Sequence, residues 1–268
     1  MLLAGVNADT GTANSKFWNR KATVALSNQW GELRLGRDYT PTFWNYTIFD
    51  AFGTNGIGDS SHVLYPPLIQ STFVRADNSI GYFLPAMGGF YGQAMVAAGE
   101  GITVGKYEGG RIGYAAGPFD IAGSYAQVGN PIPGKSDVKN WSIGGSWDFK
   151  VAKLMGYYAE TTANTLTGDA SDKSYSISGI VPIGAGEIHA SYSEGKVNIL
   201  DTKASQFALG YVYNLSKRTA LYATGSYLKN SDNGQNAITA VGIQTSGAAL
   251  PVKGGYSEGV EFGVRHFF

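Results

Sequence analysis

Short and long connections alternate strictly between the segments of this 268-residue chain. From residue 16 onward the sequence divides into about thirteen segments of alternating polarity, each near the ~9 to 11 residues that a tilted strand needs to cross a membrane. The predicted segments are 17–27, 33–38, 75–84, 90–99, 110–117, 120–128, 140–149, 152–162, 174–181, 187–195, 205–215, 219–230 and 256–268. The short connections are NQWG, PAMGG, PF, KV, PIGAG and NLSKR, and the long ones lie around 39–73, 100–109, 129–139, 163–173, 196–204 and 231–255. A soluble sandwich has no reason for this order, whereas a barrel that threads a membrane collects short turns on one side and long loops on the other.

The two faces of these segments differ in chemistry. In residues 205–215 one face is aromatic and aliphatic, and the other face is small or polar. The first face carries Phe207, Leu209, Tyr211, Tyr213 and Leu215, and the second carries Gln206, Ala208, Gly210 and Asn214. Alternation in one strand would also fit a sandwich, but the second face is too polar for a packed core. Together with the loop pattern, the faces predict an all-β fold, a transmembrane antiparallel up-and-down β-barrel with a water-filled interior.

Composition excludes several kinds of site. There is no cysteine, which excludes disulfides, zinc–thiolate sites and cysteine nucleophiles. The formal net charge of zero argues against a general binder of nucleic acid or of anionic membranes. The mean hydropathy of −0.11 resembles that of a soluble protein, but alternating residues cancel in a membrane barrel. The opening MLLAGVNADTG lacks the features of a signal peptide, so we expect either that the protein is not exported or that the sequence begins inside a longer product.

Several stretches resemble the general-diffusion porins of proteobacteria, in particular the sixteen-stranded trimeric porins of the beta-proteobacterial type. KFWNRKATVALSNQWGELRLGRDYTPTFWNYTIFDAFGTNGIG is similar to their fourth and fifth strands and the start of the constriction loop. VRADNSIGYFLP resembles the sixth strand, GYVYNLSKRTALYATGSYLKN the fourteenth and fifteenth, and GVEFGVRHFF the closing strand. The resemblance covers nearly the whole chain, and the combination of LGRDYTP, NLSKRTALY and a terminal Phe268 is specific.

This resemblance implies one porin domain over residues 1–268 and an outer-membrane channel for passive diffusion of small hydrophilic solutes and inorganic ions. It implies a homotrimer in contact with outer-membrane lipid, assistance from the barrel-assembly machinery during insertion, and no enzyme activity, cofactor, metal or nucleic-acid partner. The family has three further strands before Phe17, and here only residues 2–7 could be the end of the third. Since closed bacterial barrels have an even number of strands, we expect an N-terminally incomplete domain of about thirteen strands plus a remnant.

The long segment at residues 39–73 is the expected constriction loop. It contains glycines and prolines and greatly exceeds an ordinary connection in length. A disordered surface loop is the alternative, but Phe43, Trp44 and Phe49 are too apolar to be left in water. Its acidic groups are Asp50 and Asp59. By resemblance, the segment folds inward against the barrel wall.

Cations are expected on the wall opposite this loop. Strand parity directs Arg75 and Arg34 into the interior, and it favours Lys21 over Arg20 there, whereas the resemblance allows either. The hypothesis is that Arg75, Arg34 and Lys21 or Arg20 form a positive ladder facing Asp50, which would give a modest preference for anions. The alternative is that these charges are hydrated interior groups with little effect on selectivity.

Further charged residues point inward by parity and are expected only to line the interior: Arg111, Lys153, Glu261 and Arg265. Arg37 lies at a strand end beside the loop and could instead tie the loop through Asp38 or a loop carboxylate. Phe268 resembles the terminal signal by which outer-membrane proteins are recognised for insertion.

Two other classes of protein fit parts of the sequence. His189 near Ser191 would allow an outer-membrane hydrolase, but three histidines and no recognisable nucleophile motif argue against it. A soluble carbohydrate-binding β protein would also be rich in strands, Tyr and Trp. Extraction separates these possibilities, because a porin needs detergent and conducts ions, whereas a carbohydrate-binding protein dissolves in buffer.

Overall fold

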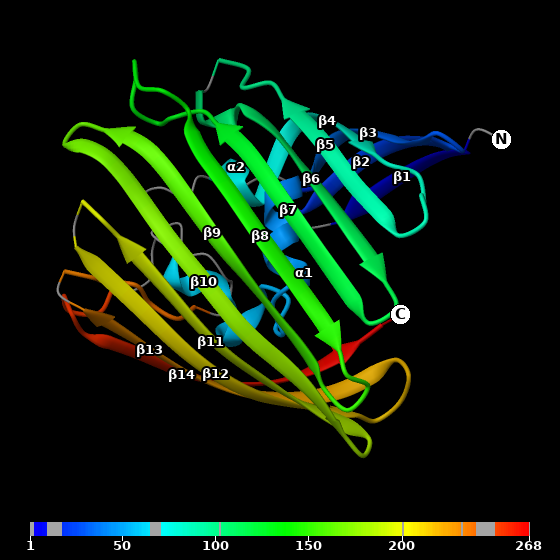
Figure 1. Cartoon of the computed structure of the whole chain (residues 1–268), viewed down its shortest axis with the longest axis vertical. Helices are drawn as coiled ribbons and strands as arrows, with labels where there is room; N and C mark the ends of the chain where they lie inside the picture. The colour runs from blue at the N-terminus through cyan, green and yellow to red at the C-terminus, as the bar shows by residue number, and fades with distance from the viewer. Residues whose placement is uncertain are drawn as a thin grey trace.

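The computed structural model describes residues 3–9, 18–64, 71–101, 103–199, 201–231, 233–239 and 250–267. Within them, fourteen strands form a single sheet in the order of the sequence, and every neighbouring pair is antiparallel. The strands are β1 Leu3–Asp9, β2 Lys21–Asn28, β3 Gly31–Tyr39, β4 Arg75–Phe83, β5 Phe90–Ala97, β6 Tyr107–Ala116, β7 Phe119–Val128, β8 Val138–Asp148, β9 Lys153–Thr165, β10 Gly168–Ile183, β11 Gly186–Val197, β12 Thr202–Asn214, β13 Thr219–Ser231 and β14 Tyr256–His266. The sheet curves around a short helical segment on its concave side (Figure 1).

The predicted up-and-down order is confirmed. The thirteen expected segments are β2 to β14, and the remnant expected at residues 2–7 is β1, which pairs with β2. Within the described residues the sheet order starts at β1 and ends at β14, and these two strands are not paired with each other. No helix in the described part of the chain is both long and apolar enough to cross a membrane.

Two of the predicted long loops are instead mostly strand. β9 ends at Thr165 and β10 begins at Gly168, although residues 163–173 were expected to be a loop. Likewise β11 ends at Val197 and β12 begins at Thr202, within the loop expected at 196–204. In these stretches the outer face is polar, as at Lys173 and Lys196, and the inner face carries small residues such as Ala163 and Ala170, so the pattern of hydropathy no longer marks a strand while the backbone ladder continues. Strands β9 to β12 therefore extend past the apolar band of the sheet at this end.

The faces of the sheet have the predicted polarity, with large apolar side chains outside and small polar ones inside. On β12, Phe207 and Leu209 are half exposed on the outer face, whereas Gln206 and Ala208 are buried on the inner face. The inner face of β10 is a row of buried serines, Ser174, Ser176 and Ser178. So large an outward apolar surface is stable only when lipid covers it.

The inner segment, the described part of residues 40–74, lies inside this curved sheet (Figure 1). It contains α1 (Pro41–Ile48), η1 (Gly56–Gly58), η2 (Ser60–Val63) and α2 (Ser71–Val74). α1 begins here because Thr40 caps it, accepting from the Phe43 N–H at 3.2 Å, and Pro41 fits the first turn. α1 contacts β5 to β8, η1 contacts β12 to β14, and η2 contacts β11 and β12. A further turn, η4 (Thr103–Gly105), connects β5 and β6.

Candidate functional site

The first half of the inner segment is held by buried polar contacts to the wall. Asn45 Nδ2 donates to Ser142 Oγ at 2.9 Å, and Asn140 Nδ2 donates to Tyr46 Oη at 3.1 Å. Asn45 and Asn140 are both fully buried. A buried amide without a partner costs free energy, so these contacts favour one position of α1 on β8.

The second half is held in the same way by more distant strands. The Ile57 N–H donates to Glu261 Oε2 at 3.0 Å, and Gln206 Nε2 donates to the Ile57 carbonyl at 3.0 Å. His189 Nδ1 lies 2.6 Å from the Ala51 carbonyl oxygen, which can only accept, so Nδ1 carries the proton. Glu261 was expected only to line the interior, but the structure makes it an anchor for η1.

Two wall glycines allow the segment to approach closely. A Cβ on Gly144 of β8 would lie 2.2 Å from the Phe49 ring, and one on Gly195 of β11 would lie 2.3 Å from the Val63 carbonyl oxygen. Any larger residue would push the segment away from the wall. The inner segment is therefore seated on the wall by shape as well as by hydrogen bonds.

Asp50 lies inside the segment and does not face the wall cations, so its predicted place in the pore is wrong. Its side chain is 4% exposed and accepts from the N–H groups of Phe52 at 3.0 Å and Thr54 at 3.2 Å. Ser60 donates to the same carboxylate from its N–H at 3.1 Å and its hydroxyl at 2.9 Å. Burial, and then repulsion from the Asp59 carboxylate, raise the pKa of Asp50 to about 6, and burial also raises the pKa of Asp59. The local chain folds around the carboxylate, which the sequence pattern did not show.

Asp38, on β3, is the acidic residue that two of the wall cations share. Arg34 Nη1 lies 2.6 Å from Asp38 Oδ2, and Lys21 Nζ lies 3.6 Å from Asp38 Oδ1. Arg34 also binds Glu32, with 2.8 Å from Nε to Oε1. Asp38 is 1% exposed, so its charge is buried beneath the two cations. Sequence reasoning weighed Asp38 only as a partner of Arg37, which instead pairs with Asp77 at 2.9 Å.

Two arginines converge on Tyr39, the last residue of β3. Arg75 Nη2 donates to Tyr39 Oη at 2.9 Å, and the Arg75 guanidinium lies 4.5 Å from the centre of the Tyr39 ring. Arg20 Nε donates to the same hydroxyl at 2.9 Å. Tyr39 in turn stacks on Phe43 of α1, with ring centres 5.6 Å apart. Tyr39 thus joins the cationic wall to the inner segment.

The choice between Arg20 and Lys21 is explained by where β2 begins. β2 starts at Lys21, which shares the inner face with the buried Thr23, whereas Val24 and Leu26 are exposed on the outer face. Arg20 precedes the strand, so parity does not restrict its direction, and its side chain reaches Tyr39. Both cations therefore lie beside the end of β3.

Comparison with known proteins identifies the family. Residues 2–233 match the Gram-negative porin family. The chain belongs to this family. It is similar to outer membrane porin protein 32 of Delftia acidovorans, with 36% identity over 97% of this chain and 77% of the relative. It is also similar to an outer membrane porin protein of Bordetella pertussis, with 30% identity over 90% of this chain and 75% of the relative.

A solved structure is similar over the entire chain. The anion-selective porin from Comamonas acidovorans superposes with a TM-score of 0.89 at 34% identity, covering 100% of this chain and 85% of that one. The predicted porin fold, outer-membrane location and channel function are confirmed. This excludes the soluble carbohydrate-binding alternative.

The other predicted residues that the structure describes have neighbours other than Tyr39. Arg111 of β6 lies over Tyr91, 4.7 Å from the ring centre, and Tyr91 Oη donates to Asp120 at 2.5 Å. Lys153 is the first residue of β9. Arg265 is exposed near the end of β14, 5.5 Å from the Phe267 ring. Phe268 lies outside the described residues, and among those residues no cluster of three or more His, Asp or Glu side chains could hold a metal.

Proposed function

We propose that solutes pass through a constriction between the inner segment, within residues 39–73, and the cationic wall of β2 to β4, with a modest preference for anions. Lys21, Arg34 and Arg75 stand on this wall, and Arg20 lies at its edge. Their main acidic partner, Asp38, is buried, and Asp50 is enclosed in the segment. Cations facing a water-filled passage attract anions and repel cations.

Arg75 is the observation that carries this proposal. Its interactions are with the hydroxyl and the ring of Tyr39, which are neutral, and no carboxylate of the described residues lies within ion-pair distance of it. Its charge therefore acts on solutes without local cancellation. The relative from Comamonas acidovorans is named as anion-selective, which supports the same preference here.

The other parts of the proposal follow from family membership. Residues 1–268 act as one porin domain that works as a homotrimer in contact with outer-membrane lipid and is inserted by the barrel-assembly machinery. A related fold, the OmpT of Vibrio cholerae, is recorded in a trimer form. The porin does no covalent chemistry. The contact of His189, the residue that suggested a hydrolase, with the Ala51 carbonyl supports an anchoring role instead.

Replacing Arg75 with Glu tests the preference. We expect the ratio of anion to cation permeability to fall about twofold or more, because the change reverses a charge beside the passage. Reversal potentials in a KCl gradient across planar bilayers measure this ratio. Lys217→Glu, in the exposed turn between β12 and β13, is the matched control and should leave the ratio unchanged. Wild-type selectivity in Arg75→Glu would refute the role of the wall.

A further inference from the structure

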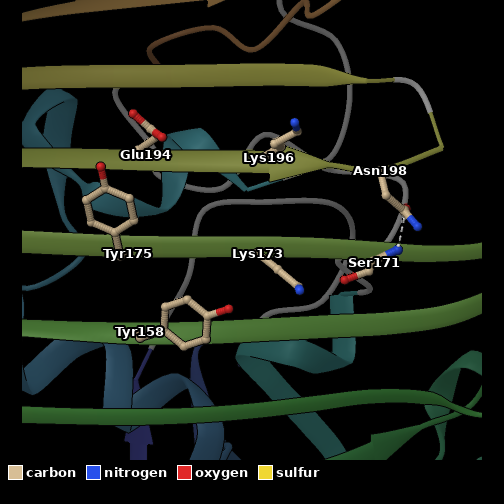
Figure 2. Close-up of a pocket in the computed structure, with 7 residues that line it drawn as sticks. All are labelled: Tyr158, Ser171, Lys173, Tyr175, Glu194, Lys196 and Asn198. Atoms are coloured by element: carbon tan, nitrogen blue, oxygen red, sulfur yellow. Dashed lines mark hydrogen bonds between the residues drawn. The ribbon is translucent and has the colours of Figure 1, made fainter.

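Three lysines lie side by side on the outer face of the sheet. In the strand register Lys173 of β10 is directly opposite Lys196 of β11, which is directly opposite Lys203 of β12. Like charges in directly opposite positions destabilise a sheet. Figure 2 shows the Lys173 and Lys196 side chains directed away from each other. An anion bound beside this lysine row would offset the repulsion between the ammonium groups.

The carboxylates near the lysine row are already occupied. Glu194 accepts from Lys203 Nζ at 2.6 Å and from the Tyr192 hydroxyl at 2.9 Å. Glu160 accepts from the Ser171 hydroxyl at 2.8 Å and lies 3.9 Å from Lys173. Lys196 lies 3.3 Å from Asp201, but both side chains are mostly exposed, so this pair contributes little. Lys173 and Lys196 remain 58% and 62% exposed and are accessible to a ligand.

An open pocket of about 430 Å³ lies over the same strands. Lys173 and Lys196 line it together with Tyr158, Tyr175 and Glu194 (Figure 2). Toward the middle of the sheet, beyond Tyr175 and Glu194, the outward residues are apolar, among them Ile177 and Phe207, which are 63% and 52% exposed. Lys173 and Ile177 are four residues apart, or ~13 Å along a strand. The surface thus changes from cationic, through a row that holds Tyr158, Tyr175 and Glu194, to apolar over the length of a lipid headgroup and its first acyl carbons.

The lysine row is at the end of the barrel where the long loops lie. It adjoins the β9–β10 and β11–β12 connections, at the same end as the 40–74 and 232–255 stretches and opposite the short turns. In outer-membrane barrels this end faces the outside of the cell. Aromatic residues mark the membrane interface of such barrels. Tyr175, which pairs with Tyr158, lies two residues from Lys173 toward the middle of the sheet. The lysines therefore lie at the level of the lipid headgroups.

We propose that the lysine row and the pocket beside it bind the phosphate groups of a lipid in the outer leaflet, with the acyl chains lying along Ile177 and Phe207. Lys173 and Lys196 favour an anionic headgroup because their carboxylate partners lie 3.9 Å away or are mostly exposed, and the apolar surface below favours a lipid over a free phosphate ion. Such a lipid would relieve the repulsion between the opposed lysines.

Native mass spectrometry of the porin in detergent tests this site with three probes: bisphosphorylated lipid A, its dephosphorylated form, and inorganic phosphate. We expect the wild type to retain bisphosphorylated lipid A and to bind the other two weakly. The double variant Lys173→Gln, Lys196→Gln should bind it about tenfold more weakly. The control is the double variant Lys150→Gln, Lys217→Gln, which loses the same charge from exposed turns at the opposite end of the barrel. It should bind bisphosphorylated lipid A as the wild type does.

Several results would overturn the proposal. Equal binding by the double variant would show that the lysines are not the site, and equal binding of dephosphorylated lipid A would show that phosphate is not recognised. Displacement by similar concentrations of inorganic phosphate would indicate a free-anion site. Since the chain has no cysteine, Lys196→Cys can be cross-linked selectively, and efficient cross-linking between subunits would place a second copy on this face.

The unfolding temperature, measured with and without lipid, is a second test. It distinguishes a lost binding site from a variant that is merely less stable. Without added lipid, Lys196→Gln should unfold at the same temperature as the wild type or higher, because one repulsion is removed. With bisphosphorylated lipid A, the wild type should gain stability and the variant should gain less. A lower unfolding temperature for the variant in both conditions would refute the proposal. Conductance should not change, so the outcome is separate from the test on Arg75.

Discussion

The carboxylate of Asp50 accepts hydrogen bonds from Phe52, Thr54 and Ser60 and lies near Asp59 inside the inner segment. Tyr157 of β9 reaches the same place, with its hydroxyl 2.9 Å from Ser60 Oγ. Two buried acids in one small region are costly when both are ionised. At the scale of the residue, this makes the seating of the segment sensitive to proton concentration.

Lowering the pH from 7 to 5 should stabilise the folded inner segment. The pKa of Asp50 is raised from its usual 3.8 to about 6, so between these values the folded state holds a proton that the unfolded state has lost. The stabilisation is complete below pH ~4 and is lost as the pH rises through about 6. Hydrogen exchange of the Thr54 and Ser60 amides, corrected for the intrinsic rate, should slow as the pH falls.

The variant Asp50→Asn is the control for this pH effect. It cannot titrate, so protection of the segment should vary much less between pH 5 and pH 7, although the loss of one acceptor lowers protection overall. Protection that is independent of pH in the wild type, or that rises with pH, would contradict the assignment to Asp50.

At the scale of the element, the inner segment depends on the strands that it touches. Its contacts come from strands that are far apart in the sequence, among them β5 to β8 and β11 to β14. Small residues at the contact points let helix and turns lie directly on the sheet, as at Gly144 and Gly195. The inner segment is therefore packed against the barrel wall along its length and does not behave as a separate loop.

Gly195→Ala should loosen the segment. Its Cβ would lie 2.3 Å from the Val63 carbonyl oxygen, so the backbone of η2 must move, at a cost of about 1–3 kcal/mol. Thermal unfolding in detergent should show the loss, and single-channel records should become noisier. Gly225→Ala on β13 is the matched control, because a Cβ there meets nothing within 4 Å. Equal losses of stability in the two variants would argue against a close contact between η2 and the wall at Gly195.

At the scale of the whole molecule, the backbone ladders hold the sheet together, and a buried apolar cluster forms where the inner segment packs against the wall. Adjacent strands pair from β1 through to β14, and the large apolar side chains point outward. In lipid every backbone group of the wall must be paired within the sheet, which makes insertion and pairing one process.

Deleting Phe268 should reduce the amount of folded porin in the outer membrane without changing the conductance of pores that form. Phe268 follows β14 and resembles a terminal insertion signal, but it is far from the proposed constriction in the sequence. Heat-modifiable mobility of outer-membrane fractions measures the folded amount. Phe268→Tyr keeps the aromatic ring and should assemble normally. Normal assembly after the deletion would remove the proposed role.

Much of the fold could be read from the sequence because its signals are local. Alternation with a period of two and turn-forming residues depend on neighbours along the chain, so they indicated β2 to β14 and their up-and-down order. The inward directions of Arg34, Arg75 and Lys21 follow from the same parity. The extra length of β9 to β12 does not follow from the sequence, because polar residues replace the apolar ones on the outer face there although the backbone ladder is intact.

By itself, the sequence indicated an all-β membrane barrel with several cations directed inward, and its resemblance to the porins predicted that the long segment lies inside. Only the tertiary structure decided which charges meet. It enclosed Asp50 within its own turn, set Asp38 beneath Arg34 and Lys21, and brought Arg75 to Tyr39. It also placed Lys173, Lys196 and Lys203 in one row. The reason is register, because a shift of one residue between neighbouring strands changes every cross-strand partner while leaving the alternation of each strand untouched.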